Sequence, residues 1–162
     1  MTGTVADEAR QVPAEEAGFL RLDQHVCFAL YTASGLMTRI YRPLLEPLGL
    51  TYPQYLAMLA LWERSPSTVS EVSERLGLEP ATLTPLLKRL EHAGLVTRRR
   101  DETDERRVLI EPTDEGRALR EKAKAVPRDL SCTIGTDQTE LAELRRLLGD
   151  FIDRLKGATS RE

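Results

Sequence analysis

Apolar residues recur at helical spacing in two short neighbouring segments between residues 68 and 94. The first segment opens with Thr68 and Glu71, the spacing of a capping box, and stops at Gly77 directly after an apolar residue. The second segment stops at Gly94 and carries apolar residues three or four positions apart: Leu83, Leu86, Leu87 and Leu90. Two short helices joined by a turn predict a helix-turn-helix.

The start of the second helix has two possible positions. If the helix begins at Pro80, Pro85 lies inside it and removes one backbone hydrogen bond, which destabilises the helix by about 3 kcal/mol. If Thr84 is the cap, Pro85 becomes the first helical residue, where proline is favoured. The sequence leaves both positions open.

Two runs with strand propensity follow Gly94 and enclose a polar tip at residues 101–105, which predicts a β-hairpin. Seven of the 23 Lys and Arg residues lie between positions 88 and 107, on the second helix and this hairpin. Because the net charge is -3 and the pI about 5.6, the positive charge has to be local. A helix-turn-helix with a basic β-wing indicates duplex DNA as the partner, whereas the plainer interpretation is a solvated charged helix and hairpin.

Helices are predicted on both sides of the wing, giving a mostly α fold with a small β-wing. The first runs from Asp23, as its cap, to Arg42, with Pro43 beyond its end. Thr51 and Thr113 each open another helix, and the last begins near Thr136. In the helix after Thr51 we expect a core stripe of Tyr55, Leu56, Leu59 and Trp62.

The apolar residues of the last helix step by three and four, as in the seam of a coiled coil. They are Leu141, Leu144, Leu148, Phe151 and Leu155. The seam could pack on the chain's own first helix, but we favour a dimer, since readers of paired DNA half-sites are two-fold symmetric. We therefore divide the chain into a flexible tail (1–18), an N-terminal dimerisation helix (19–50), a winged helix-turn-helix (51–112) and C-terminal dimerisation helices (113–162).

Composition limits the class of protein. The length of 162 residues suits one domain, and no run of about 18 apolar residues exists that could span a membrane. The first eighteen residues are polar and carry no export signal, so we expect a cytoplasmic protein. No cofactor is indicated, and the two cysteines are not expected to form a structural disulfide there.

Cys27 is a candidate reactive thiol. It falls in the first turn of the predicted long helix, where free N–H groups and the helix dipole favour a thiolate, and Tyr31 lies one turn further on. Tyr41 lies about 21 Å along the axis from Cys27, so it could serve the same site only from another subunit, and Tyr52 could join it. The plainer interpretation is a buried cysteine among core aromatics. Cys132 follows Pro127 and lies in a predicted break between helices, a flexible place from which a second thiol could reach the first.

Several segments together resemble the MarR family, in particular its organic-hydroperoxide-sensing repressors. The resemblance covers about residues 20–130 and rests on the segments 27–31 (CFALY), 41–45 (YRPLL), 51–57 (TYPQYLA), 83–91 (LTPLLKRLE) and 104–110 (DERRVLI). It implies a homodimer that occupies operator DNA when reduced and leaves it when an organic hydroperoxide oxidises Cys27.

The resemblance also assigns roles to single residues. It implies that Tyr31 of one subunit and Tyr41 and Tyr52 of the other hold the Cys27 thiol. Cys132 makes the chain look like the two-cysteine kind, in which the oxidised first cysteine forms a disulfide with the partner's second one.

On the DNA side, the resemblance places residues 82–89 in the major groove and Arg106 in the minor groove, with Asp104 pairing to an arginine. The expected DNA-binding residues are Thr82, Thr84, Lys88, Arg89, Arg98, Arg99, Asp104, Arg106 and Arg107.

Two rival interpretations remain. A thiol peroxidase would need alternating strands and helices, which the chain lacks, and there is no Cys-x-x-Cys pair. A winged-helix repressor that answers to a small phenolic ligand or a metal would leave the cysteines idle. The spacing of His25, Cys27, His92 and Cys132 matches no zinc pattern, so no metal site is expected.

Overall fold

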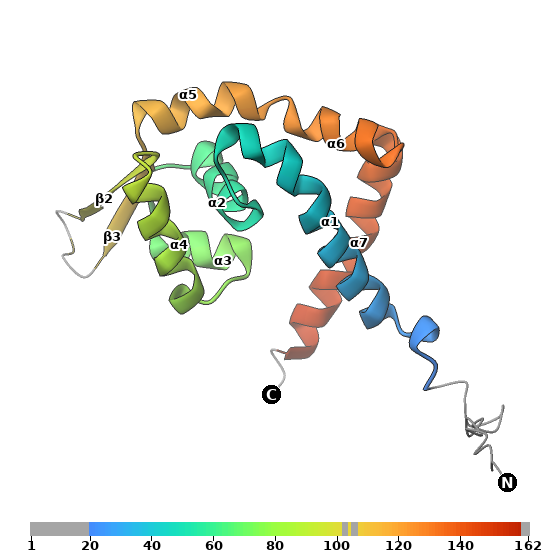
Figure 1. The fold of residues 1–162 in the computed structure, drawn as a ribbon. Coiled ribbons are helices and arrows are strands. Elements are labelled where there is room, and N and C mark those ends of the chain that lie inside the picture. The colour runs from blue at the N-terminus through green and yellow to red at the C-terminus, as the bar shows by residue number, and fades with distance from the viewer. Residues whose placement is uncertain (1–19, 102–103, 105–106, 160–162) are drawn as a thin grey trace, which may run out of the picture. The chain divides into compact units, whose positions relative to one another are not determined.

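The computed structural model describes residues 20–101, 104 and 107–159 and contains α-helices and one small antiparallel sheet (Figure 1). The helices are α1 (Val26–Leu45), α2 (Tyr52–Glu63), α3 (Val69–Leu76), α4 (Pro80–His92), α5 (Asp114–Ala123), α6 (Val126–Ile134) and α7 (Gln138–Thr159), with 3-10 turns at Leu22–Gln24 and Glu46–Leu48. The strands are β1 (Ser67–Thr68), β2 (Val96–Arg100) and β3 (Val108–Pro112). The expected mostly α, winged helix-turn-helix fold is confirmed.

The chain forms two compact units that divide inside α1, between Arg39 and Ile40. The second unit holds the helix-turn-helix, the wing and the C-terminal helices. None of the helices in the described part of the chain is long and apolar enough to cross a membrane.

The helix-turn-helix begins and ends at the predicted residues. Thr68 caps α3 by accepting a hydrogen bond from the Glu71 backbone N–H at 3.2 Å, and the Glu71 carboxylate accepts one from the Thr68 N–H at 2.6 Å. The helix then stops at Gly77, whose positive φ of 62° favours glycine. The second helix starts at Pro80, so Pro85 lies inside it.

The core lies between these helices and the sheet. Leu83, Leu86, Leu87 and Leu90 of α4 are all buried, as their spacing predicts. In α2 the predicted stripe is only partly right, because Tyr55 is buried whereas Leu56, Leu59 and Trp62 are half-buried. The fully covered face of α2 is made of small and flexible residues that the sequence analysis passed over, namely Ala57, Met58, Ala60 and Leu61.

The first long helix differs from the prediction at both ends. Asp23 does not cap it, because its carboxylate is bound by the Arg21 side chain at 2.9 and 3.1 Å within a 3-10 turn, and α1 begins at Val26. Pro43 lies inside the helix, which continues to Leu45. Leu45 is fully buried, and its packing stabilises the last turn despite the backbone bond that proline removes.

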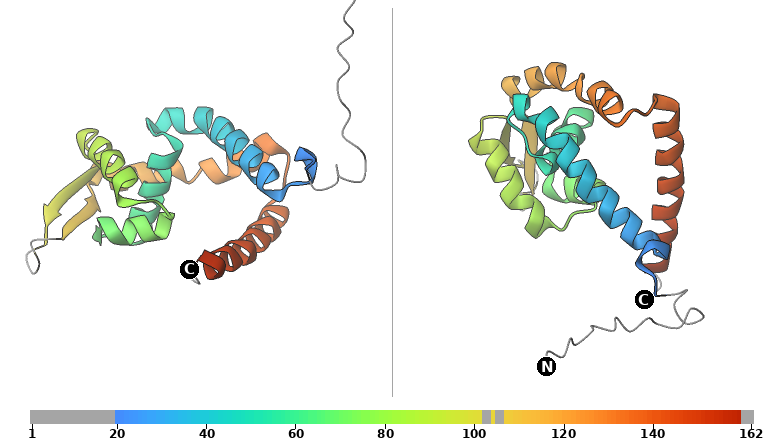
Figure 2. Two further views of the ribbon diagram at one scale, coloured as in Figure 1. Left: turned by 90° about the horizontal axis from the view of Figure 1, so that it is seen from below. Right: turned by 45° about the vertical axis from the view of Figure 1, so that its right-hand side comes forward.

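The wing is a three-stranded sheet in the order β1-β3-β2. Both hairpin strands were predicted, whereas the short β1 was missed because Ser67 and Thr68 read as the start of a helix. The β2–β3 hairpin extends beyond α3 and α4 in Figures 1 and 2. In the register, Arg98 lies opposite Ile110 and Arg99 opposite Leu109.

A polar joint connects α2, the end of α4 and the start of α5. The Thr113 hydroxyl donates to the Gly94 carbonyl at 2.6 Å and accepts from the Gly116 N–H at 3.0 Å. The Thr113 N–H donates to the Leu95 carbonyl at 3.1 Å. The Trp62 indole N–H donates to the Gly116 carbonyl at 2.7 Å. The base of the wing is therefore fixed to the scaffold helices by hydrogen bonds in which the side chains of Thr113 and Trp62 bind backbone groups.

The C-terminal helices correct one expectation. Cys132 does not lie in a break, because Pro127 stands near the start of α6, where proline is tolerated, and Cys132 is inside that helix. The last helix begins at Gln138, near the predicted Thr136. The Asp137 carboxylate caps it by accepting from the backbone N–H groups of Thr139 and Glu140.

Candidate nucleic-acid interface and thiol site

The exposed face of α4 carries the residues predicted to enter the major groove. Thr82, Lys88 and Arg89 are exposed on the side away from the buried leucines. Thr84 is half-buried, and its hydroxyl donates to the Pro80 carbonyl at 2.8 Å. Thr82, Lys88 and Arg89 thus face solvent, whereas Thr84 is engaged with its own helix; Arg89 also donates from its Nε to the Pro85 carbonyl at 3.3 Å.

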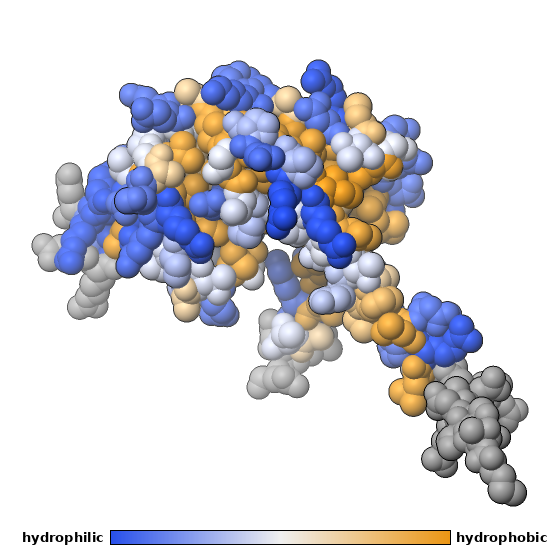
Figure 3. Space-filling model, viewed as in Figure 1, coloured by the Kyte–Doolittle hydropathy of each residue, from blue (hydrophilic) through white to orange (hydrophobic). Residues whose placement is uncertain are grey.

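The wing arginines differ in their surroundings. Arg99 and Arg107 are about half exposed and lie 3.8 Å from Glu111 and 3.9 Å from Asp101. Arg100 is exposed as well. Arg98 has a side chain only 19% exposed. Figure 3 shows hydrophilic side chains gathered over α4 and the wing, the surface that the charge distribution predicted.

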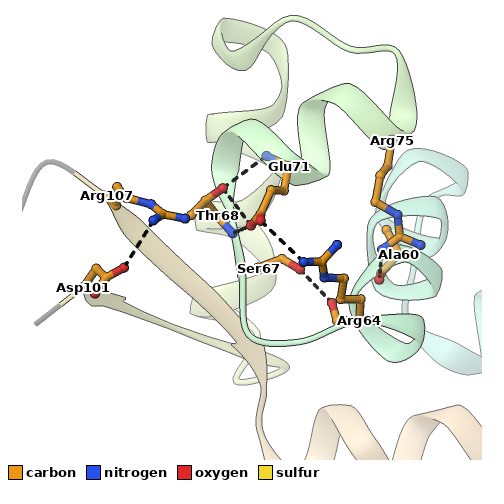
Figure 4. Close-up of polar contacts among 8 residues, drawn as sticks. All are labelled: Ala60, Arg64, Ser67, Thr68, Glu71, Arg75, Asp101 and Arg107. Atoms are coloured by element: carbon orange, nitrogen blue, oxygen red, sulfur yellow. Dashed lines mark hydrogen bonds and ion pairs between the residues drawn. The ribbon is translucent and has the colours of Figure 1, made fainter. Parts of the chain in front are cut away.

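The neck of the wing is fixed by a residue that sequence reasoning missed. The Asp101 N–H donates to the Arg107 carbonyl at 2.9 Å, and the Asp101 carboxylate lies beside the Arg107 guanidinium. Figure 4 shows this pair beside the cap formed by Thr68 and Glu71. The sequence signal that could have identified Asp101 is its position directly after the three arginines at 98–100.

Asp104 and Arg106 are the remaining wing residues that the sequence predicts to contact DNA. Asp104 is exposed, and its carbonyl accepts the Arg107 N–H at 2.9 Å, while its predicted pairing with an arginine side chain stays a prediction. Arg106 lies outside the described residues.

The cap of α3 has an electrostatic consequence. The Thr68 backbone N–H and hydroxyl donate to the Glu71 carboxylate and lower the pKa of Glu71, and the nearby guanidinium groups of Arg64 and Arg107 act in the same direction. The carboxylate at the start of the helix-turn-helix therefore stays ionised, and it faces the neck of the wing (Figure 4).

The two cysteines are free and exposed. Cys27 is the second residue of α1, still in the first turn as predicted, and no acidic residue shares that turn. Tyr31 follows one turn later on the same helix face and is 78% exposed. Cys132 belongs to α6 in the second unit. Both thiols can therefore meet a solvent-borne reagent.

The structure brings together the other two predicted tyrosines. The ring centres of Tyr41 and Tyr52 lie 4.6 Å apart, and Tyr55, which the sequence analysis assigned only to the core, lies 6.0 Å from Tyr41. Burial, and then the neighbouring phenols, raise the pKa of Tyr41 to about 12. Burial also raises the pKa values of Tyr52 and Tyr55. All three phenols therefore remain protonated hydrogen-bond donors at neutral pH.

A hollow of about 250 Å³ opens beside this cluster, between α2 and the α5–α6 region. It is lined by Tyr55, Leu59, Trp62, Glu63, Arg120, Ala123, Lys124 and Pro127. Its walls are mainly apolar, with two cationic side chains and one carboxylate, that of Glu63, among them. No group of three or more His, Cys, Asp or Glu side chains able to hold a metal occurs within the described ranges.

Sequence comparisons relate the chain to transcriptional regulators. The family described as transcriptional regulator SarA/Rot matches residues 39–123. The chain is 44% identical over 136 residues to the organic hydroperoxide resistance transcriptional regulator of Bacillus subtilis (strain 168). The match covers 84% of this chain and 92% of that one.

Solved structures have the same fold. Reduced AbfR bound to DNA is 35% identical with a TM-score of 0.74, over 88% of this chain and 97% of the other, and AbfR is a Staphylococcus epidermidis protein. Disulfide-formed AbfR has a TM-score of 0.58 at 35% identity, over 90% and 97% of the two chains. A MarR-family regulator from Rhodococcus sp. RHA1 is 28% identical with a TM-score of 0.72, over 81% and 94%.

Proposed function

Because the chain belongs to the MarR/SarA family of transcriptional regulators, which are not enzymes, we propose that it is a repressor that senses organic hydroperoxides. Two copies bind operator DNA while Cys27 is reduced, and they leave it when Cys27 is oxidised. One observation carries the proposal: an exposed cysteine and tyrosine one helical turn apart, on a chain 44% identical to an organic hydroperoxide regulator.

The DNA-binding part of the proposal uses the exposed face of α4 and the wing. Thr82, Lys88 and Arg89 meet base edges and phosphates in the major groove, with Thr84 shaping the same face. The wing supplies Arg99, Arg106 and Arg107, with Asp104 ordering its tip. The support is the local positive charge on a protein of net charge -3, and the DNA-bound AbfR with the same fold.

A homodimer is proposed because α7 has an apolar face with no buried residue in this chain. Leu144, Leu147, Ile152 and Leu155 are each about half exposed. A second copy of α7 would cover these side chains and would set the two α4 helices at the spacing of two half-sites, about 34 Å.

The proposed chemistry begins with the Cys27 thiolate. Its sulfur attacks the terminal peroxide oxygen, the O–O bond breaks, and the alkoxide takes a proton and leaves as the alcohol, so that sulfur is oxidised to a sulfenic acid and the peroxide is reduced. The thiol of Cys132 from the other subunit then attacks that sulfur. The S–S bond forms, the S–O bond breaks and water leaves.

The tyrosines hold the reactive thiol in this scheme. Tyr31 donates to the sulfur from one turn away on the same helix, and Tyr41 and Tyr52 of the other subunit donate from the stacked pair. A phenol can stabilise a thiolate only while it keeps its proton, and the raised pKa values of Tyr41 and Tyr52 support that role.

The proposal is tested by titrating a complex of the reduced protein and duplex DNA with cumene hydroperoxide. The duplex is one that the native chain selects from a randomised pool, and binding is followed by fluorescence anisotropy. We expect the native chain to be released and Cys27→Ser to stay bound. Cys132→Ser is the matched control, since it should lose the disulfide-linked dimer on a non-reducing gel while its Cys27 still oxidises. Release of the Cys27→Ser protein would refute peroxide sensing at this residue.

A second candidate function is favoured by the hollow beside Tyr55 and Trp62. Apolar walls with Arg120 and Lys124, which outnumber the one acid Glu63, suit a small aromatic anion, and such a ligand would leave the cysteines idle. Salicylate as a probe separates the two functions: release of both the native chain and Cys27→Ser from DNA by salicylate, with no effect of the peroxide, would favour the ligand.

A further inference from the structure

Arg98 stands apart from the other wing cations in its burial. Its side chain is 19% exposed, against 47% for Arg99 and 50% for Arg107. The strand register explains this difference, because directly opposed residues of an antiparallel pair share one face of the sheet. Arg98 lies opposite the fully buried Ile110, so it is on the core side of the wing.

The partner of Arg98 is on α4. The Arg98 Nη1 lies 3.6 Å from the Oε2 of Glu91, the second-to-last residue of that helix. A carboxylate near a helix C-terminus is unfavourable next to the helix dipole, and the guanidinium compensates for it. The Arg98 Nε is buried, and no hydrogen-bond partner for it occurs among the described residues. The guanidinium is thus held by one acid and by packing.

The chain between these two residues contains a bend. Gly94, with φ at 72°, ends α4 by donating to the Glu91 carbonyl at 2.9 Å, and β2 starts two residues later. A single glycine turn does not by itself fix the angle between the helix and the hairpin. The hydrogen bonds from Thr113 to Gly94 and Leu95 hold the base of the hairpin, and a side-chain contact across the turn adds a constraint further along β2.

We propose that Arg98 is a positioning residue that ties β2 to the last turn of α4, and that it is not one of the cations contacting DNA phosphates. The inference rests on the proposed function in that α4 and the wing bind duplex DNA together. The Arg98–Glu91 contact sets the angle at which the wing leaves α4, and so decides whether both elements reach their grooves at once. A phosphate would have to break this contact to reach the guanidinium.

Two measurements test the proposal, with Arg99→Met as the matched control for Arg98→Met. Methionine keeps the apolar stem of arginine and removes only the charged head. The first measurement is hydrogen exchange without DNA. We expect Arg98→Met and Glu91→Gln to speed exchange of the β2 amides near the turn, and Arg99→Met to leave them unchanged. Unchanged exchange rates of the β2 amides in Arg98→Met would overturn the proposal that Arg98 connects β2 to α4.

The second measurement is the salt dependence of binding to a duplex selected by the native chain. Arg99→Met is expected to lower the slope of log K against log salt by about one. Arg98→Met keeps the native slope and binds about fivefold more weakly at every salt concentration, the size of one lost polar contact. A slope lowered by about one in Arg98→Met would make it a phosphate contact and overturn the proposal.

Glu91→Gln separates the alternatives further. Under the proposal it weakens binding as Arg98→Met does, and the double variant is no worse than either single one. If Arg98 bound phosphate, removal of the competing carboxylate would strengthen binding. Native protein that showed no salt-dependent duplex binding would refute the proposed function itself, while the exchange experiment would still decide whether Arg98 ties the wing to α4.

Discussion

Gly116, the third residue of α5, lies against the base of the wing, and replacing it with alanine is the sharpest test of the joint between them. An added Cβ would lie 2.0 Å from the Leu95 carbonyl oxygen, 3.1 Å from the Leu95 carbonyl carbon and 3.3 Å from the Pro112 Cβ. Two of these atoms are backbone, so neither can turn away as a side chain would.

The magnitude follows from opposing effects. Alanine in a helix is favoured over glycine by about 1 kcal/mol. Against that, forcing a methyl group into a packed site costs about 1–3 kcal/mol. Displacing the Leu95 carbonyl also weakens its hydrogen bond from the Thr113 N–H, and shifting Gly116 weakens the one from Trp62, at about 1 kcal/mol each. These figures give a net loss of about 2–4 kcal/mol, so we expect Gly116→Ala to lower the free energy of unfolding by at least about 2 kcal/mol.

Thermal unfolding followed by circular dichroism measures this effect. A loss of about 2 kcal/mol lowers Tm by about 4–8 °C for a chain of this size. Gly157→Ala is the matched control, because its Cβ would meet nothing within 4 Å, and its Tm should stay level or rise slightly. Both variants are compared at one protein concentration, since a dimer's Tm depends on it. A Gly116→Ala protein as stable as the native chain would refute the close approach of α5 and the wing base.

Three further predictions concern other parts of the chain. Leu144→Glu places a charge on the apolar face of α7 and should convert a dimer into a monomer in sedimentation equilibrium, whereas Glu143→Gln should not; an unchanged mass for Leu144→Glu would contradict the α7 seam. Because folding raises the pKa of Tyr41 from 10.0 to about 12, its contribution to stability is present below pH 10 and is lost as the pH rises toward 12. Tyr41→Phe should therefore remove the tyrosinate absorbance that appears near pH 12, and overlaid titrations would disprove the raised pKa. Folding lowers the pKa of Glu71. The contribution of Glu71 to stability is therefore present above its ordinary pKa of 4.5 and is lost as the pH falls through the lowered pKa of the folded state. Thr68→Ala should lower the free energy of unfolding by about 1 kcal/mol and flatten this acid dependence, which urea titrations at several pH values would measure.

Local chemistry made much of the fold predictable. Thr68 with Glu71 and Thr51 with Gln54 form capping boxes, and Thr113 caps α5. In each case a side chain satisfies backbone groups only three residues away, so the signal lies wholly within a short segment. The burial of the α4 leucines followed from spacing for the same reason.

The errors share a different cause. Pro43 is inside α1 because the following Leu45 packs into the core, which no local signal reveals. Asp23 fails as a cap because Arg21 binds its carboxylate. Strand β1 exists only because β3 lies beside it. At all three places a tertiary or competing contact overrides a local preference, and the same holds for Arg98, whose inward direction depends on the register with Ile110.

The pairing of the wing cations bears on how a protein of net charge -3 can bind a polyanion. A largely exposed pair such as Arg99 with Glu111 contributes little to stability, on the order of 0–1 kcal/mol, because water screens it. Such an arginine can exchange its carboxylate for a phosphate with little loss to the fold. The half-buried Arg98 would lose both its contact with Glu91 and its packing. Among the wing arginines that the structure describes, exposure therefore separates two roles: the exposed side chains are available to DNA, and Arg98, turned inward, holds the hairpin against α4.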